Sequence, residues 1–152
     1  MFATKLAQLH DINFLIEMMD EFYAESDYQL NHQEAESSFS LLLSDACLGC
    51  IWIAVVDSQN VGYVVMTKRF SMEYGGLVAE IDDLFVRKEW RGKNAGKLLV
   101  TEVFQHCKAQ NILAVRVEVG TDNQAAQNLY QQFGLLPYED NRQALIGKVR
   151  SN

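Results

Sequence analysis

The 152-residue chain has few of the residues that build disulfide scaffolds or linkers. It holds three cysteines, an odd number, and a domain of this length can bury a sufficient core without disulfides. Cys47 and Cys50 form a single CxxC with no second pair, and the histidines are scattered, so no metal site is expected. One proline and nine glycines leave no low-complexity linker. We therefore predict one domain over residues 1–152, with reduced thiols and a cytoplasmic location.

Long apolar runs are also missing. No stretch of about eighteen consecutive apolar residues occurs, which argues against a membrane span. The first twenty residues carry Asp11, Glu17 and Asp20 within their apolar run, a pattern unlike that of a secretory signal. We therefore expect neither a leader nor a membrane partner.

Basic residues are absent from a long N-terminal stretch and gathered in one short segment. No Lys or Arg lies between Lys5 and Lys68, whereas residues 11–57 hold ten acids. Residues 87–97 hold five basic residues and one acid, so this segment is +4 and the rest of the −7 chain is −11. An acidic protein is a poor general nucleic-acid binder. Glycines within the basic run instead suggest a loop for a small polyanion, and the acidic part would attract a cationic partner.

The hydrophobic periodicity predicts a mixed α/β domain. Strands are expected at Phe2 to Leu6, Cys50 to Val56, Val61 to Thr67, Val78 to Val86 and Ile112 to Val119, followed by a closing hairpin of Leu135 to Tyr138 and Ala144 to Val149. Helices are expected after a cap at Asp11, after Asn31 or His32, from Gly96, and after Thr121 or Asp122. This order predicts a mostly antiparallel sheet with one parallel pair of strands joined through a helix.

The segment from Arg91 to Lys97 lies where a strand ends and a helix begins, which is the usual ligand position in such units. A Walker A loop has one residue more between its glycine and the Gly-Lys pair, and a Ser or Thr where this chain has Leu98. A dinucleotide GxGxxG is absent as well. On the loop alone, a helix entry that uses glycine only for turning stays an alternative.

The loop Arg91-Gly92-Lys93-Asn94-Ala95-Gly96 resembles the Arg/Gln-x-x-Gly-x-Gly/Ala loop of the GNAT superfamily, the acetyl-CoA-dependent N-acetyltransferases. The preceding strand, Ile81-Asp82-Asp83-Leu84-Phe85-Val86, and the later stretch from Asn123 to Leu135 are similar to two further motifs of that superfamily. One position departs from the pattern, because Asn94 stands where the family has its first loop glycine. Asparagine tolerates a positive φ better than most residues, so the loop can still form.

The resemblance implies a GNAT fold whose sheet is flanked by about four helices, with a cofactor cleft between the two parallel strands. It implies acetyl-CoA as the co-substrate and no metal. The residues that it places at the cofactor are the strand backbone at Leu84, Phe85 and Val86, the loop residues Arg91, Gly92, Lys93, Asn94, Ala95, Gly96 and Lys97, and the later residues Asn123, Ala126 and Tyr130.

Acetyl transfer to an amine needs two proton transfers. Tyr130 resembles the family's tyrosine that protonates the departing thiolate, although its position on an apolar stripe would also suit a core aromatic. The candidate bases for the incoming ammonium are Glu80, Asp82 and Asp83. Strict alternation would put Glu80 and Asp82 on one face and Asp83 on the other. The resemblance to relatives with a carboxylate two residues before the Leu84 position favours Asp82.

In this superfamily the first two helices usually shape the acceptor side, and here that region is acidic, with Tyr23, Glu25, Asp27 and Tyr28 near the connecting loop. We therefore expect the acceptor to be a primary amine on a small cationic molecule or a peptide. A non-catalytic acyl-CoA sensor or interaction module of the same fold is the alternative, because Asn94 departs from the loop pattern. Homodimers are common in the superfamily, and a closing hairpin would offer strand edges for one.

Overall fold

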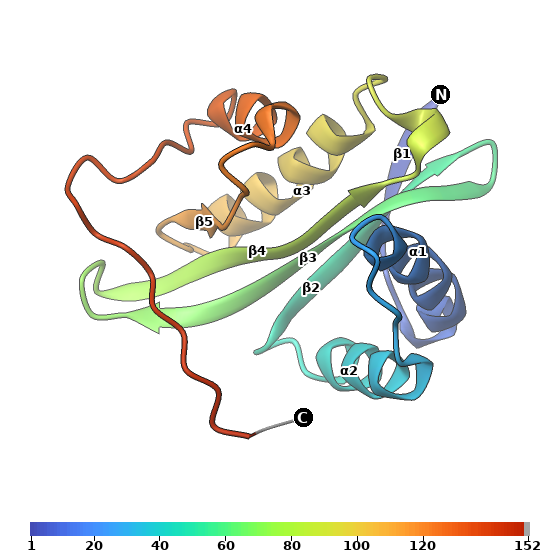
Figure 1. Cartoon of the computed structure of the whole chain (residues 1–152), viewed down its shortest axis with the longest axis horizontal. Helices are drawn as coiled ribbons and strands as arrows, with labels where there is room; N and C mark the ends of the chain where they lie inside the picture. The colour runs from blue at the N-terminus through green and yellow to red at the C-terminus, as the bar shows by residue number, and fades with distance from the viewer. Residues whose placement is uncertain (151–152) are drawn as a thin grey trace.

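A computed structural model describes residues 1–150 of the chain as a sheet covered by helices (Figure 1). The strands are β1 (Phe2–Leu6), β2 (Gly49–Val56), β3 (Gln59–Ser71), β4 (Gly76–Val86) and β5 (Val115–Val117). The helices are α1 (Ile12–Ala24), α2 (His32–Ser44), α3 (Ala95–Ala109) and α4 (Gln124–Gln131), with short 3-10 turns η1 (Leu9–Asp11) and η2 (Lys88–Trp90). No helix among these 150 residues is long and apolar enough to cross a membrane.

The sheet has the order β1-β2-β3-β4-β5. Its first four strands pair antiparallel, and β4 and β5 pair parallel through the α3 crossover. The predicted mixed sheet with one parallel pair is therefore confirmed. α1 and α2 cover one face and α3 covers the other, with α4 beside it (Figure 1).

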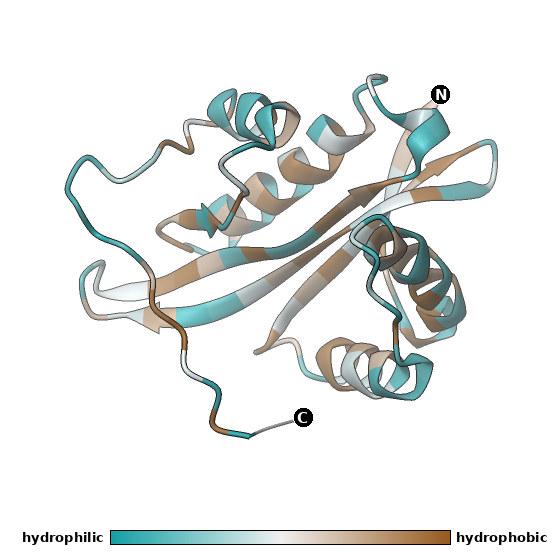
Figure 2. Cartoon of the chain, in the orientation of Figure 1, coloured by the Kyte–Doolittle hydropathy of each residue, from teal (hydrophilic) through white to brown (hydrophobic). Residues whose placement is uncertain are grey.

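Two apolar clusters form the core, one on each face of the sheet. The first joins the sheet to α3 through Leu99, Val100 and Val103, all fully buried. The second joins it to α1 and α2, with Leu15 and Met18 fully buried. Because both faces are covered, β2 is apolar along its whole length and β3 is apolar over residues 61–66, which Figure 2 shows along the central strands.

Local signals explain where several elements begin. The Asn31 side chain accepts a hydrogen bond from the Glu34 amide (3.1 Å), so the predicted cap of the second helix is confirmed. Asp57 and Ser58 both have positive φ, as a two-residue hairpin turn requires. The capping role predicted for Asp11 is wrong. Its carboxylate does not bind the free amides of α1 but accepts from Lys5 Nζ (2.8 Å) and from the amide of the residue before η1 (2.9 Å).

The predicted closing hairpin is also wrong, since residues 136–150 contain no strand. β5 itself is shorter than expected and pairs with β4 over three residues on each strand. So short an edge strand offers few backbone groups to hold another strand. The chain after α4 instead passes the β3–β4 turn, where Arg142 Nη1 lies 3.3 Å from Glu73 Oε2 (Figure 1).

Candidate active site

The loop between β4 and α3 has the backbone geometry of an anion site. Gly92 (φ 72°) and Asn94 (φ 71°) are both in the left-handed region. Asn94 thus adopts the conformation expected of it and stands at the N-cap of α3. The amides that follow in the first turn of α3 have no acceptor within the helix, which is the arrangement that binds anions.

The glycines of this loop fit a bound ligand and a close helix contact. A Cβ on Gly92 would meet nothing within 4 Å, so the loop surface is open there. A Cβ on Gly96 would lie 3.3 Å from Leu129 Cδ2, so the glycine lets α3 and α4 approach closely. Residues 91–94 are exposed, whereas Ala95 is buried at 2% exposure and fixes the start of α3 against the sheet.

Two arginines of the basic segment are held by acids of α1. Arg87 donates to Glu21 (2.9 Å) and Glu17 (3.0 Å), and Arg91 donates to Glu25 just after the last turn of α1. The sequence grouped all the basic residues of this segment with the loop. Their pairing with α1 shows that the arginines also join the loop to the opposite face of the sheet.

Two lysines of the segment have no such partner. Lys93 Nζ lies 5.0 Å from the Trp90 ring centroid, and Lys97 is exposed in the first turn of α3. Among residues 1–150, neither ammonium is within ion-pair distance of an acidic side chain. Lys88 is also exposed and in none of these ion pairs, but it lies earlier, in η2. Lys93 and Lys97 are the two lysines within the loop and the first turn of α3, where they are available for a phosphate.

β4 and β5 stop pairing after Ile81 and Val117, so β4 runs on through Val86 without a neighbour on that edge. The sequence expected Leu84, Phe85 and Val86 to offer backbone groups there. The Val86 carbonyl already accepts a hydrogen bond from Arg91 Nε (2.8 Å). The Phe85 side chain packs on the α1 face, so it can serve a ligand at this edge only through its backbone.

Tyr130 combines the two roles that the sequence left open. It is 6% exposed and belongs to the apolar cluster under α3, so its ring is part of the hydrophobic core. Its hydroxyl makes no hydrogen bond to another residue within 1–150, and burial raises the pKa of Tyr130 to about 12. The phenol therefore stays protonated near neutral pH and can donate a proton.

Asn123 and Ala126 occupy the start of α4. The Asn123 side-chain oxygen accepts a hydrogen bond from the Ala126 amide (3.2 Å), which makes Asn123 the N-cap of the helix. Its side-chain NH2 group makes no hydrogen bond within the described part of the chain. The cap orients that NH2 group, which stays free for the cofactor contact that the sequence predicts.

A β-bulge changes the arrangement of the three candidate bases. The register of β3 with β4 pairs Val65 with Asp83 and Met66 with Ile81, so Asp82 is the extra residue. Ile81 and Leu84 consequently pack in the same cluster under α3. Strict alternation would put Asp83 on the same face as Ile81, which is the α3 face. Asp83 instead lies on the α1 face of the sheet, so the expected alternation is wrong.

Asp83 is the most perturbed of the three carboxyls. Burial, and then the charge of Asp82, raise the pKa of Asp83 to about 7, although the Tyr63 hydroxyl opposes the rise by donating to Asp83 Oδ2 (3.2 Å). The Asp82 side chain is exposed. Glu80 lies beside Arg116, with Oε2 3.2 Å from Nε, and burial raises the pKa of Glu80. This Oε2 atom is buried without a well-directed hydrogen bond.

One aromatic side chain of α1, Tyr23, lies close to the two aspartates and packs against a second, Tyr28, from the following loop. Burial and the charges of Asp83 and Asp82 raise the pKa of Tyr23. The Tyr23 ring stands edge-on to Tyr28, with centroids 5.5 Å apart, and Tyr28 is 60% exposed. Sequence reasoning missed Tyr63 here. Its position in a buried strand was a usable signal, since a buried tyrosine hydroxyl needs a polar partner.

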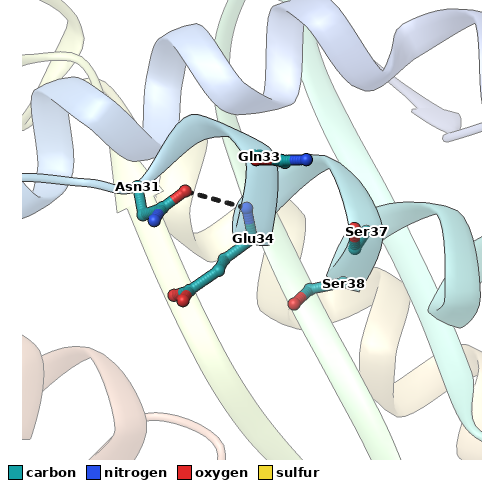
Figure 3. A pocket seen from close by; sticks show the side chains of 5 residues that line it. All are labelled: Asn31, Gln33, Glu34, Ser37 and Ser38. Atoms are coloured by element: carbon teal, nitrogen blue, oxygen red, sulfur yellow. Dashed lines mark hydrogen bonds between the residues drawn. The ribbon is translucent and has the colours of Figure 1, made fainter. Parts of the chain in front are cut away.

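A separate hollow lies at the start of α2 (Figure 3). It is lined by polar side chains of that helix and its cap: Asn31, Gln33, Glu34, Ser37 and Ser38. The only hydrogen bond among them is the cap of the helix itself. This hollow contains none of the residues that the sequence places at the site.

The sequence model described as the acetyltransferase (GNAT) family matches residues 12–135. An uncharacterized N-acetyltransferase of Archaeoglobus fulgidus is 30% identical over 122 residues, which cover 74% of this chain and 82% of that protein. The chain belongs to the GNAT family. The proteins of this family are N-acetyltransferases, and acetyl-CoA is their typical co-substrate.

Two further proteins are similar to this chain. A Bacillus subtilis protein named as a candidate ribosomal protein bS18-alanine N-acetyltransferase is 33% identical over 82 residues, which cover 49% of this chain. The match spans about half of that relative, 54% of its length. The crystal structure of the integron cassette protein HFX_CASS3, from the Cole Harbour salt marsh metagenome, superposes with a TM-score of 0.85 and is 34% identical. That match covers 98% of this chain and 91% of the other.

Proposed function

We propose that the protein transfers the acetyl group of acetyl-CoA to a primary amine on a small cationic molecule or a peptide. The observation that carries the proposal is the position of Asp83. The β4 bulge turns this carboxyl toward α1, beside the strand edge that β5 leaves unpaired. This position supports a base beside the unpaired edge of β4, on the strand that leads to the loop at residues 91–97.

The loop residues can hold the co-substrate, whose thioester supplies the acetyl group. Amides of residues 92–97 would donate to its pyrophosphate, and Lys93 and Lys97 would add positive charge. The open surface at Gly92 and the left-handed backbone at Asn94 fit this use. The free backbone groups of β4 near Leu84 would pair with its amides as an added strand does.

Two side chains of this chain would move the protons. Asp83 would take a proton from the acceptor ammonium, so that the free amine attacks the thioester carbon. As the new C–N bond forms and the C–S bond breaks, Tyr130 would give its phenolic proton to the sulfur, so that CoA leaves as the thiol. The nitrogen of the new amide then loses its surplus proton, which restores the phenol of Tyr130 directly or through water. A carboxyl with a pKa of about 7 is suited to the first step at neutral pH, since half of it is then the basic form.

The surroundings of Asp83 favour a cationic acceptor. Asp82 and Asp83 are adjacent carboxylates close to Tyr23, and Tyr28 packs edge-on to Tyr23. This combination attracts an ammonium group by charge and by its fit to aromatic faces. The name of the Bacillus subtilis relative gives an alanine of ribosomal protein bS18 as the acceptor. A peptide α-amine is therefore one acceptor to test beside small polyamines.

The experiment has two stages. Thermal unfolding with acetyl-CoA, CoA, ATP–magnesium and NAD should show stabilisation by the first two only. At about a hundred times the dissociation constant we expect about 2.7 kcal/mol, or a rise of about 5 to 11 °C. Acetylated products should then be detected by mass spectrometry across polyamines, aminoglycosides and alanine-ended peptides. Product detection by mass spectrometry is preferred to a thiol-reactive dye that reports released CoA, because the exposed free thiol of Cys47 would also react with the dye.

Asp83→Asn and Tyr130→Phe are the matched variants for the second stage. Both should bind acetyl-CoA as the wild type does, and both should lose most turnover. A wild type that binds acetyl-CoA but acetylates none of these amines would contradict the proposed acceptor class. The absence of any stabilisation by acetyl-CoA or CoA would contradict the proposal as a whole.

A further inference from the structure

Tyr63 is a fully buried residue of β3 whose hydroxyl makes a single contact. Its ring packs edge-on against Phe39 of α2, with centroids 6.4 Å apart, and is tilted against Phe85 of β4, with centroids 6.2 Å apart. Within residues 1–150 the hydroxyl makes one hydrogen bond, which it donates to Asp83 Oδ2 (3.2 Å). The packing of the ring on two elements therefore fixes the position of this donor.

The bulge in β4 brings the carboxyl to this donor. Tyr63 pairs with Phe85 in the register of β3 and β4, so Asp83 is the diagonal neighbour of Tyr63, at a distance that a long aromatic side chain can span. Both rings belong to the apolar cluster on the face that α1 and α2 cover (Figure 1). Without the extra residue Asp82, the Asp83 side chain would point to the opposite face and away from the hydroxyl.

The two carboxyl oxygens of Asp83 differ in their surroundings. Oδ2 accepts the hydrogen bond from Tyr63, whereas Oδ1 accepts none in the described part of the chain. Asp83 is half-buried, and its Oδ1 is not among the buried polar atoms of residues 1–150 that lack a partner, so this oxygen is in contact with solvent. An ammonium group that approaches the carboxyl therefore meets Oδ1.

The other titratable groups around Asp83 do not stabilise its ionised form. Asp82 on the same strand adds a like charge, which raises the pKa of Asp83 after burial has done so. Tyr23 of α1 lies close enough for Asp83 to raise its pKa, but within the described structure its hydroxyl donates no hydrogen bond to that carboxyl. Arg91, in the loop after β4, is ion-paired with Glu25. The hydrogen bond at Oδ2 is thus the interaction here that favours the carboxylate.

We propose that Tyr63 is the positioning residue of the base: its hydroxyl holds Asp83 Oδ2, so that Oδ1 takes the proton of the acceptor ammonium. This inference rests on the proposed function, in which Asp83 is the base. An N–H bond of the ammonium breaks, its electron pair stays on the nitrogen, and the proton binds Oδ1. Burial, and then the charge of Asp83, raise the pKa of Tyr63, so the phenol keeps its own proton and acts only through the carboxyl.

Tyr63→Phe tests this role because it keeps the ring and removes the donor. Loss of a hydrogen bond to the ionised form raises the pKa of Asp83, so the rise of kcat/KM with pH should move up by about 0.5 to 1 pH unit. Activity relative to the wild type should fall about three- to tenfold at pH 6 and recover to within about twofold at pH 9. A merely structural role would lower activity by the same factor at both pH values.

Ile53→Val is the matched control for damage to the core. Ile53 is fully buried in the same apolar cluster and pairs with Tyr63 across β2 and β3, but its side chain has no polar group. The variant should lower the melting temperature without moving the pH dependence of kcat/KM. A shift of that dependence in Ile53→Val as large as in Tyr63→Phe would overturn the proposal, because packing alone would then account for it.

Carboxyl carbon NMR gives a second readout that needs no substrate, with Asp83→Asn used to assign the signal of Asp83. The midpoint of the Asp83 titration should be higher in Tyr63→Phe than in the wild type by about 0.5 to 1 pH unit. An unchanged midpoint would overturn the role of Tyr63 and leave the proposed function in place, and so would an equal loss of activity at pH 6 and pH 9. An active Asp83→Asn variant would instead overturn the base of the proposed function and this inference with it, even where the midpoint moves in Tyr63→Phe.

Discussion

Replacing Asp83 by Asn is expected to stabilise the protein while it removes activity. Burial and the charge of Asp82 raise the pKa of Asp83 from 3.8 to about 7 in the folded state. Between these two values the folded protein binds a proton that the unfolded chain releases. The free energy of unfolding of the wild type must therefore fall as the pH rises through this window.

The magnitude follows from the two pKa values. Each pH unit between them is worth about 1.4 kcal/mol, so the full effect above pH 7 has an upper limit of about 4 kcal/mol. Partial access of solvent to the carboxyl reduces this, and Asn can still accept the hydrogen bond from Tyr63. We expect Asp83→Asn to raise the free energy of unfolding by about 1 to 3 kcal/mol near pH 8. Near pH 3, where Asp83 is mostly protonated in both the folded and the unfolded state, the wild type and Asp83→Asn should be equal in stability.

Urea unfolding at the two pH values measures this difference, and the pH dependence of kcat/KM measures the catalytic part. Wild-type kcat/KM should rise about tenfold per pH unit below pH 7 and level off above it. Asp82→Asn is the control that separates the two aspartates. It removes a like charge from Asp83, so it should retain activity and move the rise to lower pH.

Two results would refute the reasoning about Asp83. The first is an Asp83→Asn variant that is less stable than the wild type near pH 8, because the buried carboxylate would then not be disfavoured. The second is loss of activity in Asp82→Asn together with an active Asp83→Asn variant. In that case the base is Asp82, as the sequence alone predicts.

The remaining predictions concern the loop, the phenol and the strand contact. Tyr130→Phe should lower kcat at least tenfold, while the acetyl-CoA dissociation constant stays within about twofold. Its free energy of unfolding should change by less than about 1 kcal/mol, because the hydroxyl has no hydrogen-bond partner to lose. Asn94→Ala should destabilise the protein by about 1 kcal/mol and weaken acetyl-CoA binding, because Asn94 has a φ of 71°, which alanine rarely adopts. Asn94→Gly should do neither, and equal melting temperatures of the two variants would contradict this. Gly62→Ala should destabilise by about 1 to 3 kcal/mol, because its Cβ would lie 2.6 Å from the Phe85 carbonyl oxygen. An unchanged melting temperature in that variant would show that β3 and β4 can separate at no cost.

Much of the fold could be predicted because its signals are local. Periodicity gives the four helices and the five strands in their order, and Asn31, one of the two expected starts of the second helix, gives a cap by a short-range hydrogen bond. The anion loop could be predicted for the same reason, since its glycines and Asn94 act within a few residues. These features need no knowledge of the tertiary contacts.

The features that sequence reasoning missed depend on distant partners. The bulge at Asp82 is defined only against β3, and alternation counted along β4 alone assigns Asp83 to the wrong face. The absent closing hairpin is a similar case. The apolar pattern of residues 144–149 favours a strand, but it does not show which segment that strand would pair with. Asp11 was expected to cap a helix, yet Lys5 from β1 draws its carboxylate away.

Charge counted along the sequence does not show which acidic and basic residues pair with one another, for the same reason. The acidic stretch of α1 was expected to attract a cationic acceptor and the basic segment to bind phosphate, but Glu17, Glu21 and Glu25 hold two of the basic residues instead. Opposite charges that pair this way cancel at a distance. The field that an acceptor meets therefore comes mainly from the Asp82-Asp83 pair at the bulge. Since a carboxylate half-buried at the point of attack is screened less than surface charges, we expect the KM of a cationic acceptor to rise only weakly with salt.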